Sequence, residues 1–152
     1  MYIISNDYDE TIIHISFNRY EKADAIIIND SNRNENQIVE IFNNSLKNAI
    51  MIISFNDLYN YFYKSGLWKY KHYNIKAQEI DKFETNWDYS FKIFCVFYIG
   101  ENIQFSQIED ILESIRINNP NLEIMFSCCL DTKLKSDEID INIFNKINAG
   151  LI

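Results

Sequence analysis

Residues 91–130 read FKIFCVFYIG-ENIQFSQIED-ILESIRINNP-NLEIMFSCCL, and this stretch decides the fold. Its first nine residues are almost all apolar, which is typical of a strand covered on both faces. Apolar residues then recur at steps of three and four, as on one face of a helix, at Ile108, Ile111, Leu112 and Ile115. Ser106 and Glu109 have the spacing of a helix-capping box, and Pro120 lies in the turn that ends the helix. The apolar run 122–130 predicts a second strand.

A final strand follows the polar loop at 131–137. Ile139, Ile141 and Ile143 alternate with Asp140, Asn142 and Phe144, as in a strand with one face buried and one face solvated. Residues 90–147 are therefore predicted to form a strand–helix–strand–strand unit, an order that suits a sheet covered by helices.

The first half predicts further strands and a long helix. Residues 2–5 and 11–17 read as a hairpin, and 25–28 as a buried strand. From Glu35 to Tyr63 the spacing is helical, although the run from Ile50 to Phe55 could also pass for a strand. Gly66 could end this helix, and residues 65–89 read as a connector with one short helix near 76–83. We expect one α/β domain over 1–152, with a mixed sheet packed against a long core helix and a second, shorter helix. Its parts are 1–64, the connector and 90–147.

Composition narrows the class of partner. The chain has 152 residues, 47% of them hydrophobic, which suffices for a real core. Its formal charge is −8 and no stretch is strongly basic, so nucleic acid is a poor partner and a basic protein surface is a better one. The sequence predicts neither a signal peptide nor a membrane span. The three Cys, an odd number in apolar surroundings, indicate a reducing compartment, so we expect a cytoplasmic protein.

Residues that could carry chemistry are sparse. The three Gly, at 66, 100 and 150, are too far apart for a phosphate-binding loop. Cys128 and Cys129 are adjacent in a predicted strand and point to opposite faces, so they suit a core better than a metal site. Cys95 with His72 is a formal nucleophile–base pair without local support. We therefore predict a protein that is not an enzyme, with no catalytic residue, cofactor or metal.

One aromatic and basic stretch stands out in this acidic chain, at residues 65–73. Under one hypothesis it forms a protein interface, because Trp and Tyr are enriched in binding hot spots. The interface residues would be Leu67, Trp68, Tyr70, His72 and Tyr73. Under the alternative, the aromatics fold onto the core while the Lys tips reach water. A third reading, single-stranded nucleic acid, is disfavoured by the net charge.

The second half also resembles a known family. The stretch 94–100, the entry at 103–105 and the helix 106–117 resemble the C-terminal domain of FtsZ, the bacterial tubulin-like cell-division GTPase. The closest matches are 121–126, the Leu130–Asp131 pair and the Asp137–Glu138 opening of the last strand. Residues 23–30 and the long helix look like the family's last GTPase-domain strand and its core helix. Ser65-Gly66-Leu67 falls where the family has its catalytic loop, and the resemblance covers about 23–147.

The departures from the family imply a truncated, degenerate relative. The Gly-rich GTP-binding loop is missing, and residues 65–76 carry no acid, whereas the family needs acids there to attack GTP in the neighbouring subunit. The resemblance implies a non-enzymatic interaction domain that lacks the GTP site and binds itself as a homodimer, or binds a tubulin-like filament subunit. The alternative is a small acidic immunity or antitoxin-type inhibitor that neutralises a basic toxin.

Overall fold

The computed structural model describes residues 1–18, 22–83 and 91–147. The strands among them are β1 (Tyr2–Ser5), β2 (Ile12–Phe17), β3 (Ala25–Asn29), β4 (Gly66–Lys76), β5 (Lys92–Ile99), β6 (Glu123–Leu130) and β7 (Glu138–Lys146). The helices are α1 (Glu35–Lys47), α2 (Phe55–Phe62), α3 (Phe105–Asn118) and the short 3-10 helix η1 (Ala77–Lys82). The predicted fold class, a mixed sheet packed against helices, is confirmed.

The described strands form one curled sheet in the order β1-β2-β3-β4-β7-β5-β6. β1 and β2 form the predicted antiparallel hairpin, and β2–β3, β3–β4 and β5–β6 pair in parallel. β7 is antiparallel to both β4 and β5. It therefore joins the N-terminal part of the sheet to the strand–helix–strand unit.

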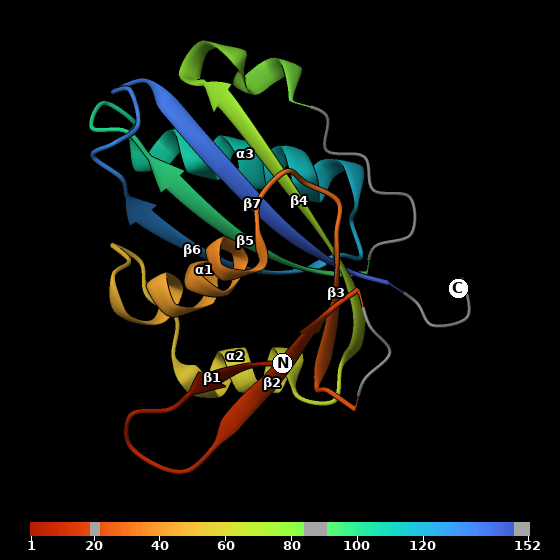
Figure 1. Ribbon diagram of the computed structural model, residues 1–152. Coiled ribbons are helices and arrows are strands. Elements are labelled where there is room, and N and C mark those ends of the chain that lie inside the picture. Colours follow the sequence, from red (N-terminus) through yellow and green to blue (C-terminus); the bar gives the residue numbers. More distant parts are fainter. Residues whose placement is uncertain (19–21, 84–90, 148–152) are drawn as a thin grey trace.

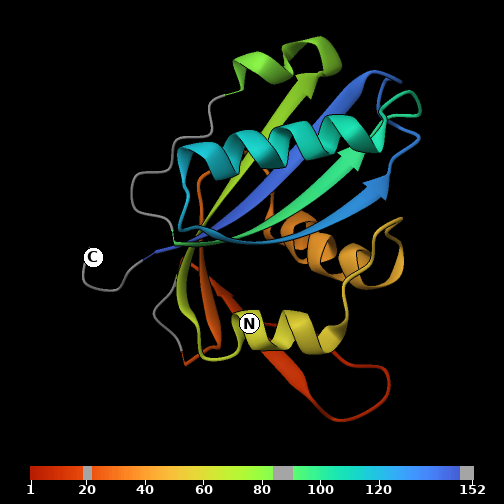
Figure 2. The same cartoon turned by 180° about the vertical axis from the view of Figure 1, so that it is seen from behind.

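The helices cover opposite faces of this sheet. α1 and α2 lie on one face, and α3 lies on the other, where Figure 2 shows it in front of β5 and β7 (Figure 1, Figure 2). The α1/α2 core contains large aromatic side chains from both halves of the chain, namely Phe42, Phe62, Trp68, Phe94 and Phe144. The α3 core is mostly aliphatic, with Ile108, Ile111, Leu112, Ile115, Ile139 and Ile141.

The long helix predicted from Glu35 to Tyr63 is wrong, because the structure has two helices with a break between them. Asn34 caps α1, and Ser54 starts α2 by accepting a hydrogen bond from the Asp57 amide at 3.1 Å. Between them Met51 forms a β-bridge with Cys128 of β6. The stretch that could pass for a strand thus pairs with a strand edge, since tertiary pairing overrides its helical spacing.

The prediction that residues 65–89 form a connector is also wrong for its first part. Its first part is the eleven-residue strand β4, which lies between β3 and β7. Gly66, with φ +88, makes the turn that leads into this strand, and the predicted short helix near 76–83 is confirmed as η1. Residues 84–89 of the connector, like Gly150, lie outside the described residues. The strand escaped detection because β4 is buried to different degrees on its two faces and mixes Lys with aromatics.

Two smaller expectations at the C-terminal unit need correction. α3 is capped by Gln104 and Gln107, not by Ser106 and Glu109. β7 is buried on both faces rather than half-buried, because the polar residues at 140 and 142 are enclosed together with the Ile residues. The predicted strands at 91–99, 122–130 and 139–143 and the helix at 106–117 are otherwise confirmed as β5, β6, β7 and α3.

Candidate functional site

The five residues predicted as an interface all lie on β4, but they do not form one patch. Side chains alternate between the two faces of a strand. Trp68 and Tyr70 belong to the α1/α2 core, whereas Tyr73 packs against the α3 core and contacts Phe83, with ring centroids 5.1 Å apart. The stretch therefore divides its aromatics between two layers of the fold.

Three of these side chains are enclosed within the chain. Trp68 and Tyr70 are fully buried, and Leu67 is 9% exposed. The Trp68 indole N–H donates to Ser65 Oγ at 2.8 Å, and the Tyr70 hydroxyl donates to Asn142 Oδ1. Buried side chains with satisfied polar groups support the core interpretation of these three, and we do not retain them as contact residues.

His72 has a different environment, at the polar end of the α1/α2 face. Arg33 Nη2 donates to His72 Nε2 at 2.9 Å and to Asp140 Oδ2 at 3.1 Å. Asn74 Nδ2 donates to Asp140 Oδ1 at 2.7 Å. This Arg33–His72–Asp140–Asn74 network joins the loop before α1 to two neighbouring strands, β4 and β7.

The network fixes the charge state of Asp140. Burial alone would raise the pKa of this carboxyl, but the neighbouring His72 ring, the hydrogen bond from Asn74 and the positive charge of Arg33 outweigh it. The net effect holds the pKa of Asp140 below its ordinary value of 3.8. An ionised Asp140 therefore anchors Arg33 over the sheet.

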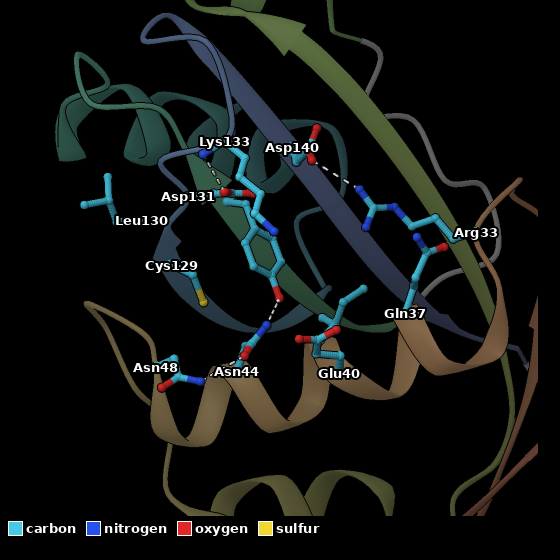
Figure 3. Close-up of a pocket in the computed structure, with 12 residues that line it drawn as sticks. Arg33, Gln37, Glu40, Asn44, Asn48, Cys129, Leu130, Asp131, Lys133 and Asp140 are labelled. Atoms are coloured by element: carbon cyan, nitrogen blue, oxygen red, sulfur yellow. Dashed lines mark hydrogen bonds and ion pairs between the residues drawn. The ribbon is translucent and has the colours of Figure 1, made fainter.

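A polar cavity of about 440 Å³ opens beside this network (Figure 3). One wall is the side of α1, and the other is formed by the ends of β5, β6 and β7 and the loop after β6. The polar side chains that line it are Arg33, Gln37, Glu40, Asn44, Asn48, Tyr98, Asp131, Lys133 and Asp140. Two bases and three acids face it, so its chemistry suits a small polar ligand that carries both donors and acceptors.

The cavity contains two protonated groups that are poor nucleophiles. Burial raises the pKa of the Tyr98 hydroxyl to about 12. Burial also raises the pKa of the Cys129 thiol to about 12, and the charges of Cys128 and Asp131 act in the same direction. Asn44 donates to the Tyr98 hydroxyl at 2.9 Å, and the nearby His72 Nε2 accepts from Arg33. These side chains position one another and suit binding better than proton transfer or nucleophilic attack.

All three cysteines are buried, and Cys128 and Cys129 point to opposite faces of β6, as predicted. Cys128 and Cys129 face the α3 core and the α1/α2 core respectively, and Cys95 is fully buried in the α3 core. Burial raises the pKa of the Cys95 thiol far above its ordinary value. In the described ranges 1–18, 22–83 and 91–147, no group of three or more His, Cys, Asp and Glu side chains could hold a metal ion.

No helix in the described part of the chain is both long and apolar enough to span a bilayer.

Asp140 and Arg33 are the site residues that sequence reasoning missed. Alternation with Ile139 and Ile141 indicated that Asp140 faces water, yet it is only 7% exposed. Its partners Asn74, His72 and Arg33 lie 66 residues or more before it in the chain. Such a network has no local signal, because it depends on β4 and β7 pairing.

Comparisons with known proteins give a likeness in fold. No protein-family model matches the chain, and no curated protein matches it. Among solved structures, the empty FtsZ dimer of M. jannaschii superimposes on 81% of the chain at 12% identity, with a TM-score of 0.57. A point mutant of FtsZ from M. jannaschii covers 82% at 11% identity, with a TM-score of 0.58. CetZ2 of Haloferax volcanii, in a GTPγS-bound protofilament, covers 84% at 9% identity, with a TM-score of 0.54.

The match is one-sided in length. The chain spans 45%, 47% and 48% of these three proteins, less than half of each. At such low identity the likeness concerns the fold and not the activity. The expected FtsZ C-terminal-domain-like architecture is confirmed, and the chain shares the fold of part of the FtsZ/tubulin-like proteins.

Proposed function

We propose that the chain is a non-enzymatic protein-interaction domain that binds a subunit of a tubulin-like filament or a second copy of itself. The observation that carries the proposal is the superposition of more than four-fifths of the chain on proteins captured as a dimer and as a protofilament. A domain with the fold of an assembling subunit is well suited to docking on such subunits.

The absence of GTP chemistry is part of this proposal. The three Gly of the sequence are 34 or more residues apart, so they cannot form one phosphate-binding loop. In the resembled family the acids that attack GTP lie in the loop after the core helix. Ser65-Gly66-Leu67 fall at that loop in the sequence, and residues 65–76 contain no carboxylate. Equilibrium titration with a fluorescent GTP analogue should show no saturable binding.

The proposed contact surface for the filament subunit is the linker between α1 and α2, residues 48–54. Ile50 and Ile52 are each 63% exposed, while Met51 between them is held against β6. The Cys128 carbonyl accepts hydrogen bonds from the Ile50 and Met51 amides at 2.8 and 3.2 Å. Two aliphatic side chains are thus displayed on a fixed backbone, an arrangement that favours a partner over solvent.

Co-sedimentation with purified FtsZ polymers tests the filament part. The wild-type chain should pellet with the polymers or change their mass, and Ile50→Asp should abolish this, because a carboxylate would be buried in the contact. The matched control is Ile117→Asp on α3, where the side chain is 70% exposed. Equal pelleting of both variants, or no pelleting of the wild type, would contradict the proposal.

A further inference from the structure

The two edge strands of the sheet differ in what covers them. The outer edge of β6 is covered in part by the α1–α2 linker, and Ser127 Oγ donates to the Met51 carbonyl at 2.8 Å. At the other end of the sheet, no described strand pairs with the outer side of β1. None of the four residues of β1 is charged or proline, although these are the residues that commonly protect an edge.

The outward backbone groups of β1 can be assigned from its pairing with β2. The Asn6 amide donates to the Thr11 carbonyl at 3.1 Å, in the same register as the β1–β2 pairs. Backbone groups alternate along an antiparallel pair. The N–H and C=O groups of Ile3 and Ser5 therefore point away from β2. The residue opposite Ile3, His14, supports this assignment. Its carbonyl points away from β1, because it accepts a hydrogen bond at 3.0 Å from the Asp24 amide on the β3 side.

This spacing is self-complementary. If two copies lie antiparallel with Ile4 of each on a two-fold axis, Ile3 of one copy lies opposite Ser5 of the other. Directly opposed residues with facing amides exchange both N–H···O=C bonds. Every outward backbone group of Ile3 and Ser5 is then satisfied in both copies.

Side chains and charge are compatible with this arrangement. The Ile3 side chain is 55% exposed, and in the two-fold arrangement the two Ile3 side chains become diagonal neighbours. The acidic loop that follows β1, with Asp7, Asp9 and Glu10, lies at opposite ends of the interface in the two copies. This separation limits repulsion in a chain of net charge −8.

A groove beside the C-terminal end of β1 leaves space for the second copy. A groove of about 420 Å³ lies between residues 5–8 and the segment 52–56, with Leu46, Ile53 and Phe55 among its apolar lining. In the two-fold arrangement this groove is beside the start of the incoming strand.

We propose that β1 is a dimerisation edge, at which a second copy of the chain pairs antiparallel through Ile3 and Ser5 and joins two sheets into one. This inference rests on the self-binding part of the proposed function. It uses the free edge of β1 and not the Ile50 side chain, so Ile3→Pro and Ile50→Asp test the two contacts separately, although Ile52 of the linker also lines the groove beside Ser5.

Sedimentation equilibrium over a range of concentrations tests the dimer, with Ile3→Pro as the decisive variant. Proline removes the outward N–H of residue 3 but no β1–β2 hydrogen bond, so the monomer should keep its fold. The dimer dissociation constant should rise at least tenfold. Ile3→Ser keeps the amide and should raise it less, and Ile50→Asp should leave it unchanged.

Amide exchange of the wild type gives a second readout that requires no variant. The Ile3 and Ser5 amides should exchange more slowly as concentration rises. The proposal would be overturned by a chain that stays monomeric at every concentration or by a dimer whose dissociation constant Ile3→Pro does not change. It would also be overturned if the Ile3 and Ser5 amides exchanged as fast in the dimer as in the monomer. A dimer lost in Ile50→Asp but kept in Ile3→Pro would instead place self-binding at the linker.

Discussion

The α1/α2 core and the α3 core lie on opposite faces of the same sheet, yet they are built from different side chains. β7 illustrates the contrast, because Asp140, Asn142 and Phe144 face α1 while the alternating Ile residues face α3. The buried residues of the α3 core all come from the second half of the chain and are mostly Ile. The α1/α2 core gathers aromatics from positions 17 to 144, together with buried polar groups. One face thus provides stability through simple burial, and the other combines burial with a polar site.

Truncating an aromatic side chain at the centre of the α1/α2 core should have the largest effect. Phe62 is fully buried, and its ring centroid lies 4.4 Å from that of Trp68 and 5.6 Å from that of Phe94. Phe62→Ala should lower the free energy of unfolding by about 3–5 kcal/mol, through lost burial and the cavity that remains. Urea denaturation measures this. The exposed Ile117→Ala should change stability by less than about 0.5 kcal/mol, and equal losses in the two variants would refute the assignment.

A truncation on the other face should cost less and should be independent of the first. Ile111 is 1% exposed in the α3 core, and Ile111→Ala should cost about 2–4 kcal/mol. Combined with Phe62→Ala, the losses should add to within about 0.5 kcal/mol, because the two residues share no core. Phe62→Ala with Phe144→Ala should deviate from additivity, since those rings are in one cluster. Strong coupling between residues 62 and 111 would break the comparison.

The smallest of the three effects should depend on pH and belong to the α1/α2 face alone. Asp140→Asn should cost about 1–3 kcal/mol at neutral pH, because Arg33 and His72 lose an ionised partner. The folded-state pKa of Asp140 is depressed, so its contribution is present above the ordinary value of 3.8 and is lost as pH falls through the folded-state pKa. The wild type and the variant should therefore converge in stability on acidification. Glu113→Gln on α3 is the control, and a constant gap at all pH values would exclude this role for Asp140.

The same contrast explains what could be predicted from the sequence. The α3 unit was readable, because Ile108, Ile111, Leu112 and Ile115 are close in sequence and their spacing alone specifies a buried helix face. The break at 48–54 was not readable, since the pairing of Met51 with Cys128 joins residues 77 positions apart. The aromatic stretch on β4 was visible, but whether Trp68 and Tyr70 face a partner or the core depends on strands β3 and β7 on either side. Asp140 was misjudged for the same reason, because its partners are distant in the chain.

The position of β7 has a consequence for biosynthesis. The central strand β4 is paired over nine residues with the last described strand, from Trp68 opposite Lys146 to Lys76 opposite Glu138. A ribosome-bound chain therefore completes neither core until β7 has been translated, because β7 supplies side chains to both. Contacts over such sequence separations slow folding and leave apolar strands exposed meanwhile. Folding of this domain should be all-or-none and should follow the synthesis of β7, and truncation before β7 should give chains that depend on chaperones.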